Sequence, residues 1–434
     1  MTTARKSSQY LQHYAETEAR HISLQPTART YDECLIIPAY AEPPELIERW
    51  QSLTHCAHSI LIILVLNYPA DNDSAASINS EPAGADTNAA LRATLTALPP
   101  KEVLPGVGKL YFLFENTDIL LVERAHGLPA DQGVGLARKI GADIACSLKS
   151  AQRLRSRWLH CTDADATLPG DYFSQCDKQS QQVTAVCHPF RHMHETATSS
   201  NAAQLYELRL HYYVRGLRRA GSPYAYQTLG SCISIDTEAY QQVRGFPRRA
   251  AAEDFYLLNK LAKLGPVVDG VGAPIVLDAR PSQRVPFGTG PAVAALQAEA
   301  NPLQKPLFYN PRSFLALGAI LDVVPTLYNH PEPVQLIHDA LANFDAAANV
   351  IEAMGLQRCV RHCQQHSGTS EGFSRHFHQW FDGFRTLKFI HGLRTAGYQD
   401  LTLTESLQQK ENIWPQATDR DWTLQQLLDT CAAQ

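Results

Sequence analysis

The most constraining feature of this 434-residue chain is a continuous apolar run at 59–66, Ser-Ile-Leu-Ile-Ile-Leu-Val-Leu. A strand with one face in water alternates apolar and polar residues, and this run does not alternate. The run is also far too short to cross a bilayer as a helix, which takes about 20 apolar residues. It is typical of a strand in a parallel sheet that is covered on both faces.

Further β-like runs and amphipathic segments alternate along the chain. In 132–148, for example, Leu136, Ile140, Ile144 and Leu148 recur every fourth residue and share one helix face. Strands and helices that alternate with short connections predict an α/β fold, a mostly parallel sheet flanked by helices. The expected strands are 34–37, 59–66, 110–114, 119–122, the run before Asp163, 182–190, 228–235 and 274–277, and the expected helices are 45–53, 88–98, 132–148, 201–220 and 251–261.

The pattern divides the chain into three parts. Residues 1–30 are polar and predict an N-terminal arm, 31–290 carry the α/β pattern, and 291–434 predict a smaller helical C-terminal subdomain. Aromatic residues are dense at 377–389, which indicates a packed core rather than a cofactor site. For this subdomain two roles stay open, shaping the acceptor pocket and forming a homodimer contact.

Charge and cysteine usage exclude some classes of protein. A formal net charge of −5 lacks the basic excess of a nucleic-acid-binding protein. The first 20 residues are polar and do not resemble a signal peptide, and no apolar run predicts a transmembrane segment. The ten cysteines include no Cys-x-x-Cys pair, which indicates reduced thiols and a cytoplasmic location.

Two acids follow directly after a predicted strand, in Thr-Asp-Ala-Asp at 162–165. In an extended chain Asp163 and Asp165 would project to the same side, about 6 to 7 Å apart at Cα. Two like charges this close favour a hard cation such as Mg²⁺ or Mn²⁺. A solvated turn is the alternative, because Asp, Pro and Gly are ordinary turn residues. Ligands of such sheets bind beyond the carboxyl ends of the strands, where Tyr40 and Asn67 are also expected.

The chain contains five motifs, Ile-Ile-Pro-Ala-Tyr-Ala-Glu at 36–42, Gly-Leu-Ala-Arg-Lys-Ile-Gly at 135–141, Asp-Ala-Asp at 163–165, Gly-Phe at 245–246 and Glu-Asp at 253–254. In this order they resemble the motifs of the family 2 glycosyltransferases, which have the GT-A fold. The resemblance covers 31–290, and three positions depart from the family pattern, Ala41 and Lys139 where Asn is usual and Asn67 where acids are usual. Because Asn67 cannot act as a carboxylate, the nucleotide, uridine or guanosine, stays open.

The resemblance implies a metal-dependent, non-processive enzyme that moves a sugar from a UDP- or GDP-linked donor to an acceptor hydroxyl. It implies Asp254 as the general base, with Glu253 beside it in contact with acceptor or sugar. Asp163 and Asp165 would hold Mg²⁺ or Mn²⁺. The expected donor-binding residues are Pro38, Tyr40, Glu42, Asn67, Arg138, Asp163, Ala164, Asp165, Arg280 and Arg284.

Several of these residues have a second interpretation. Arg138 is either a fixed charge at the diphosphate or a surface cation of its helix. Arg280 and Arg284 either close over phosphates or belong to a linker between domains. Asp278 is a further candidate metal ligand. The histidine-rich segment 188–195 is expected to be a substrate-facing loop rather than a zinc site, since no cysteine has zinc-site spacing to it.

Two other functions remain alternatives. Sugar-phosphate nucleotidyltransferases use similar strand-end chemistry, but they open with a glycine-rich loop where this chain has Pro-Ala-Tyr-Ala-Glu at 38–42. A catalytically silent nucleotide-sugar-binding protein would bind nucleotide with metal and show no turnover. Inverting and retaining stereochemistry both stay open, because retaining relatives work without a carboxylate base.

Overall fold

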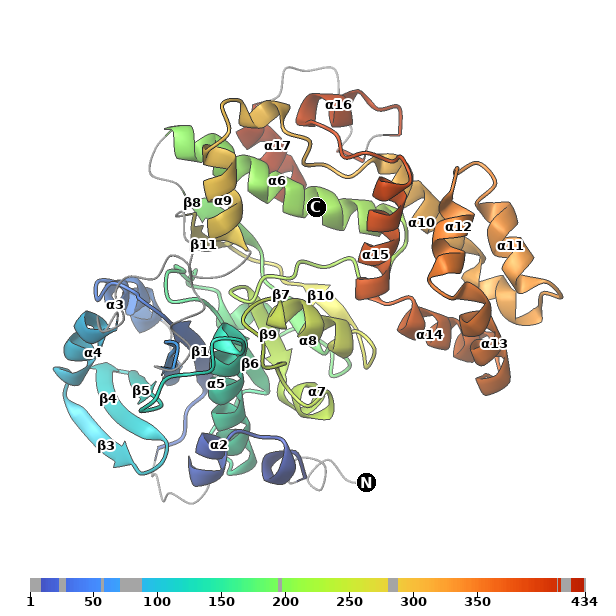
Figure 1. Ribbon diagram of the computed structural model, residues 1–434. Helices are drawn as coiled ribbons and strands as arrows, with labels where there is room; N and C mark the ends of the chain where they lie inside the picture. Colours follow the sequence, from blue (N-terminus) through green and yellow to red (C-terminus); the bar gives the residue numbers. More distant parts are fainter. Residues whose placement is uncertain are drawn as a thin grey trace. The chain divides into compact units, whose positions relative to one another are not determined.

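The computed structural model describes residues 9–22, 29–55, 58–70, 88–193, 197–279, 288–411, 413–414 and 423–432. The chain divides into two compact units, drawn in Figure 1. Unit 1 consists of Met1–Met193 and Thr228–Pro291, and unit 2 of His194–Gln227 and Ala292–Gln434. The segment 194–227 falls inside the predicted range 31–290 but groups with the helical unit, and the three-part division stays a prediction.

Unit 1 is a mixed α/β fold built on a nine-stranded sheet with the order β10-β7-β9-β6-β1-β2-β5-β4-β3 (Figure 1). All strands run in the same direction except β4 and β9, whose pairings are antiparallel. The sheet is therefore mostly parallel, as the sequence predicts. Its strands are β1 Glu33–Ala39, β2 Ile60–Leu66, β3 Pro100–Leu104, β4 Gly108–Phe114, β5 Thr117–Val122, β6 Trp158–Cys161, β7 Ala185–Cys187, β9 Ile233–Asp236 and β10 Val267–Asp269.

The central strands β6, β1 and β2 are parallel neighbours. Every side chain of β2 is buried, which confirms a strand covered on both faces. Beyond the strand ends the backbone stays paired for one more residue, since Thr162 N–H donates to Ile36 O (3.1 Å) and Asn67 N–H to Ala39 O (2.7 Å). The loops that follow β1, β2 and β6 therefore leave the same edge of the sheet.

A second, two-stranded sheet pairs β8 (Phe190–Met193) with β11 (Ile275–Asp278) in parallel. Thr167 bridges antiparallel to Val276, with Thr167 N–H on Val276 O at 2.8 Å and Val276 N–H on Thr167 O at 3.0 Å. The chain after β6 is thus tied to β11.

Helix α5 (Gly133–Ser150) packs on β1, β2 and β6 (Figure 1). Its residues from 135 to 148 are all buried, because the N-terminal helix α2 covers its other side. The remaining helices of unit 1 are α2 Thr17–Ile22, α3 Leu46–Arg49, η1 Trp50–His55, α4 Ala89–Thr96, η3 Phe173–Cys176, α7 Thr237–Gln242 and α8 Glu253–Leu261.

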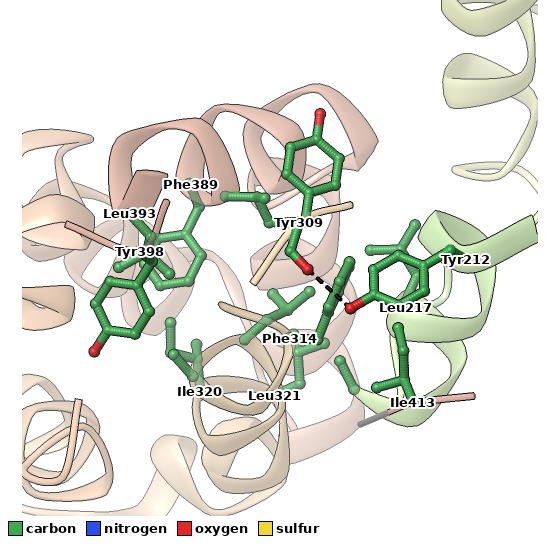
Figure 2. Close-up of a cluster of buried hydrophobic side chains, with 14 of the residues drawn as sticks. Tyr212, Leu217, Tyr309, Phe314, Ile320, Leu321, Phe389, Leu393, Tyr398 and Ile413 are labelled. Carbon is green, nitrogen blue, oxygen red and sulfur yellow. Dashed lines mark hydrogen bonds between the residues drawn. The ribbon is translucent and has the colours of Figure 1, made fainter. Parts of the chain in front are cut away.

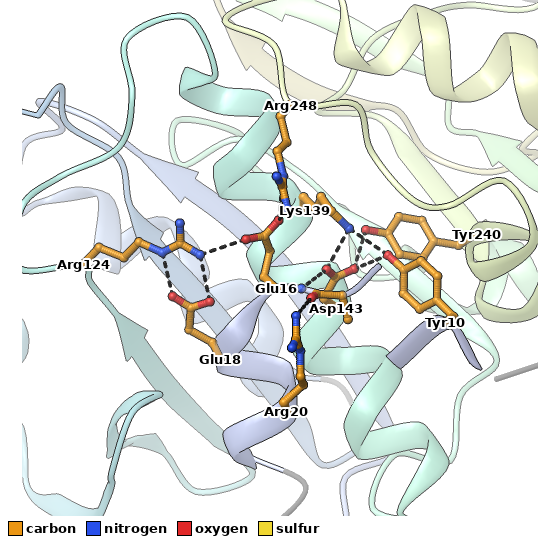
Figure 3. Close-up of polar contacts among 10 residues, drawn as sticks. Tyr10, Glu16, Glu18, Arg20, Arg124, Lys139, Asp143, Tyr240 and Arg248 are labelled. Carbon is orange, nitrogen blue, oxygen red and sulfur yellow. Dashed lines mark hydrogen bonds and ion pairs between the residues drawn. The ribbon is translucent and has the colours of Figure 1, made fainter. Parts of the chain in front are cut away.

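The N-terminal arm is fastened to α5 through the buried carboxylate of Asp143 (Figure 3). Asp143 accepts hydrogen bonds from Tyr10 Oη (2.5 Å), Glu16 N (2.8 Å) and Tyr240 Oη (2.9 Å), and pairs with Lys139 Nζ (2.8 Å). Desolvation by burial raises the pKa of Asp143, and the nearby Lys139 acts against this shift. The arm thereby completes the polar shell of a charge in the core.

Unit 2 is helical and has its own apolar core, part of which Figure 2 shows. Helix α6 (Ala197–Arg219) joins this core, and the Tyr212 hydroxyl donates to Tyr309 O at 2.9 Å. Buried Phe377 and Phe389 confirm that the aromatic stretch is core. The other helices are α9 Thr289–Gln297, α10 Pro311–Val323, α11 Pro333–Ala340, α12 Ala347–Ala353, α13 Leu356–His366, α14 Ser370–Trp380, α15 Gly383–Thr395, α16 Leu403–Gln408 and α17 Leu424–Ala432, with 3-10 turns η4 Pro302–Gln304 and η5 Val324–Asn329.

Some expected elements differ from the observed ones. The sequence does not predict the edge strands β3 and β10, because β3 begins with Pro100 and has mostly exposed side chains and β10 has only three residues. The strand expected at 182–190 contains β7, and its last residue, Phe190, is the first residue of β8 in the other sheet.

Within the described segments, every helix is too short or too polar to traverse a bilayer. Nine of the ten cysteines lie in these segments, and all nine are buried free thiols.

Candidate active site

The structure corrects the predicted geometry of the acid pair. β6 ends at Cys161, opposite the first residue of β9, and beyond it the Thr162 N–H still donates to Ile36 O of β1. Residues 163–166 instead form a turn in which Ala166 N–H donates to Asp163 O (3.2 Å). The period-two alternation of a strand therefore does not orient Asp163 and Asp165. Ala164 between them is buried, whereas the Asp163 side chain is 42% exposed.

Arg138, from the middle of α5, joins the acid turn to the start of α8. Its Nη2 donates to Asp163 Oδ1 at 2.5 Å, and its Nε donates to Glu253 Oε1 at 2.9 Å. The Arg138 side chain is only 3% exposed, so the expected alternative of a surface cation is wrong. One guanidinium thus connects the Asp-x-Asp and Glu-Asp motifs, which are far apart in the sequence.

Asp254 lies next to this pair and is held by two backbone amides. Gly230 N–H donates to its Oδ2 at 2.7 Å, and Phe255 N–H donates to its Oδ1 at 2.6 Å. Gly230 also lies against Arg138, because a Cβ at this glycine would come within 2.8 Å of the guanidinium. The residue before the acids, Ala252, has a φ of 60°, in the left-handed region that is costly for alanine.

Burial and neighbouring charges shift the pKa values of Arg138 and Asp254. Burial by itself would lower the pKa of Arg138, but Asp163 and Glu253 outweigh it and raise this pKa, so the guanidinium stays charged. Burial raises the pKa of Asp254 to about 7, and the charge of Glu253 adds to the shift, while the two amides and Arg138 act against it. A carboxylate with a pKa near the working pH is suited to take up a proton.

A close approach between α5 and the loop before α8 sets this geometry. Gly135 N–H donates to Arg249 O at 3.0 Å. A Cβ on Gly135 would come within 2.6 Å of the carbonyl oxygens of Arg249 and Pro247. Only glycine therefore lets the first turn of α5 approach the backbone that leads to Glu253.

Asp165 belongs to a second group of contacts. Arg49, the last residue of α3, donates through Nη1 to Asp165 O, and its Nη2 lies 3.2 Å from Asp278 Oδ2. The further candidate ligand Asp278 is thus adjacent to the acid turn, although about a hundred residues separate them along the chain.

The side chains around the turn fit a hard divalent cation in their chemistry. Asp163 uses one carboxylate oxygen for Arg138, and Asp278 uses one for Arg49, so each has a second oxygen to offer. Among described residues, however, only one group of three metal-ligating side chains has donor atoms within 4.8 Å of one another, and it contains none of these acids. The acids therefore suit a cation held by one or two carboxylates together with substrate phosphates, as is usual for Mg²⁺.

The remaining predicted donor-binding residues lie on the same sheet edge, except two. Pro38 is buried in β1, Glu42 is buried in the loop after it, and Tyr40 and Asn67 are partly exposed beyond β1 and β2. Arg280 and Arg284 fall outside the described residues.

The loop after β1 has a strained residue. Ala41 has a φ of 52°, and its N–H donates to the Oδ1 of buried Asn88 at 3.0 Å. Asparagine, which the resembling family has at this place, tolerates the left-handed conformation better than alanine does.

The described part of the histidine-rich segment is a strand rather than the loop that the sequence suggests. His188 and His192 are 1% and 4% exposed, and β8 runs through 190–193. The cause is the second sheet, since pairing with β11 holds this segment in extended form. Residues 194–195 lie outside the described part of the chain.

Sequence reasoning missed three residues of the site, Arg49, Asn88 and Gly230. Arg49 had a weak signal, a cation seven residues after the first motif. Asn88 and Gly230 carry no local signal, because only the tertiary fold brings an amide oxygen to Ala41 and a backbone N–H to Asp254.

No protein-family model matches the sequence, and no curated protein matches it either. Among solved structures, the chain is similar to the mannosyltransferase PcManGT from Pyrobaculum calidifontis in complex with GDP-Man and Mn²⁺, with 16% identity, a TM-score of 0.36, and 87% of this chain and 96% of that one covered. It is also similar to TarS from S. aureus in complex with UDP-GlcNAc, with 11% identity, a TM-score of 0.35, and 84% and 90% covered. TM-scores this low support neither a family nor an activity for this chain.

Proposed function

We propose that this chain is a metal-dependent glycosyltransferase of the GT-A type, family 2, that moves a sugar from a UDP- or GDP-linked donor to an acceptor hydroxyl. The observation that carries the proposal is the buried Arg138, whose guanidinium binds both Asp163 and Glu253. It brings together the two motifs that this chemistry requires, one for the donor diphosphate and one for the acceptor proton.

At the donor side, Arg138 orients Asp163 and adds a fixed positive charge. Asp163 and Asp165, with Asp278 as a third candidate, would hold Mg²⁺ or Mn²⁺, which supplies neutralisation of the charge on the leaving diphosphate. Tyr40, Glu42 and Asn67 at the neighbouring strand ends would contact the nucleoside. Arg280 and Arg284 remain candidates for phosphate binding.

At the acceptor side, Asp254 would take the proton of the attacking hydroxyl onto a carboxylate oxygen. Such a positioned base typically contributes about 10² to 10⁴ in rate. Glu253 is only 4% exposed and is paired with Arg138, so we assign it a positioning role rather than contact with the acceptor.

The test measures melting temperature with UDP, GDP and other nucleoside diphosphates, each with and without Mn²⁺. A ligand that binds the native state stabilises it by mass action and so raises the melting temperature. At a ligand concentration of 100 times the Kd, the free energy of unfolding increases by about 2.7 kcal/mol. We expect one nucleotide to give a shift that requires the metal. Asp165→Asn should remove this linkage, and Asp254→Asn should keep it but abolish sugar transfer.

Two results would contradict the proposal. If no nucleoside diphosphate gave a metal-linked shift, the donor site would be wrong. If Asp254→Asn and Asp165→Asn weakened nucleotide binding equally, Asp254 would not be the base. Metal-linked binding without turnover of any nucleotide sugar would favour the silent binding protein.

A further inference from the structure

A second group of metal-ligating side chains lies in unit 1, apart from the acids of the proposed active site. His160 of β6, Cys176 at the end of η3 and His188 just after β7 are each no more than 1% exposed. Their donor atoms all lie within 4.8 Å of one another. Ser234 of β9, also fully buried, lies between the two imidazoles.

The hydrogen bonds of His160 fix which nitrogen faces the group. Its Nε2 lies 3.1 Å from Glu33 Oε2, and its Nδ1 lies 2.7 Å from Ser234 Oγ. A carboxylate only accepts hydrogen bonds, so Nε2 carries the proton that points to Glu33. In the neutral ring, Nδ1 therefore presents a lone pair to Ser234.

The bonds of His188 lead to the same result from the opposite side. Gln175 Nε2 donates to Asp171 Oδ1 (3.2 Å) and to Ala273 O (2.9 Å), so the other amide atom of Gln175 is the acceptor. His188 Nδ1 lies 2.9 Å from this Oε1 and must donate to it. In the neutral ring, His188 Nε2 therefore presents a lone pair to Ser234 Oγ at 2.6 Å.

Two lone pairs thus face a single hydroxyl that has only one proton. Ser234 can satisfy only one ring nitrogen. Cys176 Sγ lies 3.9 Å from His188 Nε2, and its thiol can donate to the second. The group is therefore satisfied either by these two protons, by an extra proton on His160, or by one cation at the centre that takes the lone pairs of both rings and of a Cys176 thiolate.

We propose that His160 Nδ1, His188 Nε2 and Cys176 Sγ bind one zinc-class divalent ion, with the Ser234 hydroxyl at the fourth position. Two nitrogens and a thiolate are the ligands that zinc prefers in a tetrahedral site. Metal binding displaces the thiol proton of Cys176 to solvent.

The outer contacts are those of a zinc site. Zinc-bound histidines usually donate their remote N–H to a carboxylate or carbonyl oxygen. Glu33 does this for His160 and Gln175 does it for His188. A metal at this site would hold β6, η3, β7 and β9 together, and its ligand His160 lies three residues before Asp163. We infer a structural role for the metal, which does not depend on the proposed transferase.

The experiment uses the full chain and Co²⁺ as a spectroscopic probe, after chelator treatment. We expect about one equivalent of Co²⁺ with an intense thiolate-to-metal band and tetrahedral visible bands, and displacement of Co²⁺ by Zn²⁺. Cys176→Ala should abolish the thiolate band and weaken Zn²⁺ binding by about tenfold or more, while Cys187→Ala, a nearby buried thiol, should retain both. Asp165→Asn should also retain both, which separates this site from the acids.

Several results would overturn the proposal. Absence of a thiolate band in the wild-type chain would do so whether or not Cys176→Ala folds. Equal loss of the band in Cys187→Ala, or a Zn²⁺ Kd weaker than about 10 μM, would do so too. A metal-free chain in which NMR shows a doubly protonated His160 and which binds no Zn²⁺ would show that an extra proton satisfies Ser234.

Discussion

At the scale of single residues, Arg138 is the side chain that links the acids of the site. It is a buried cation with two carboxylate partners, and one of them, Glu253, is buried as well. Removing a partner from such a pair leaves a charge without compensation in a medium of low dielectric constant. The stability of the chain and its proposed function therefore depend on the same side chain.

We expect Arg138→Ala to lower the free energy of unfolding by about 3 to 5 kcal/mol, since Glu253 stays buried without its partner. Urea denaturation measures this change. The matched control is Arg155→Ala, because Arg155 is 69% exposed and pairs with Asp32 at the surface, so its loss should cost about 0 to 1 kcal/mol. Equal effects of the two changes would show that the Arg138 pair is not buried in solution.

The raised pKa of Asp254 predicts a pH dependence of transfer. A general base works in its deprotonated form, so kcat/KM should rise as pH increases through about 7 and level off above it. The measurement is a pH profile of transfer with the donor below saturation. The pKa of about 7 lies between pH 6 and pH 8, so a flat profile over this range would contradict the role of Asp254 as general base.

The same shift has the opposite sign for stability. The pKa of Asp254 is higher in the folded chain than in the unfolded one, so the folded state binds more protons and loses stability as pH rises from about 4 to 7. Asp254→Asn removes this cost, and we expect it to raise stability at pH 8 while it abolishes transfer. Calorimetry at pH 5 and pH 8 measures the difference in stability between the variant and the wild type. This difference should be smaller at pH 5, which lies inside the range of about 4 to 7 over which the cost develops.

At the scale of elements, the position of α5 against the loop before α8 decides whether Arg138 reaches both acids. We expect Gly135→Ala to destabilise the chain by about 1 to 3 kcal/mol and to weaken nucleotide binding, because its Cβ would meet two carbonyl oxygens. Gly170→Ala is the control, since a Cβ there meets nothing within 4 Å. Denaturation and nucleotide titration of both variants test the contact.

At the scale of the whole molecule, unit 1 is completed by the N-terminal arm. Tyr10 donates to Asp143 and accepts from Lys139 Nζ at 2.9 Å (Figure 3). The arm therefore contacts a buried ion pair of α5 that is far away in the sequence. Lys139 stands where the resembling family has Asn. In this chain its partner is Asp143 in α5, one helical turn away.

We expect Tyr10→Phe to lower the free energy of unfolding by about 1 to 3 kcal/mol, because it removes a hydrogen bond from a buried carboxylate. Tyr14→Phe, at a partly exposed position of the same arm, should change it by no more than about 0.5 kcal/mol. Thermal or urea unfolding of the two variants measures this. If Tyr10→Phe left the free energy of unfolding unchanged, the arm would not contribute to the stability of the core.

The sequence by itself determined the strands β1, β2 and β6, the edge at which they end, and the acidic motifs at 163–165 and 253–254. These follow from hydrophobic runs and turn residues, which are local signals. The tertiary structure alone decided the turn at Asp163, the link from Arg138 to Glu253, the contact of Arg49 with Asp278, and the cluster of His160, Cys176 and His188. Each of these joins residues from separate segments, and their approach is set by how helices and strands pack, a property that no local pattern encodes.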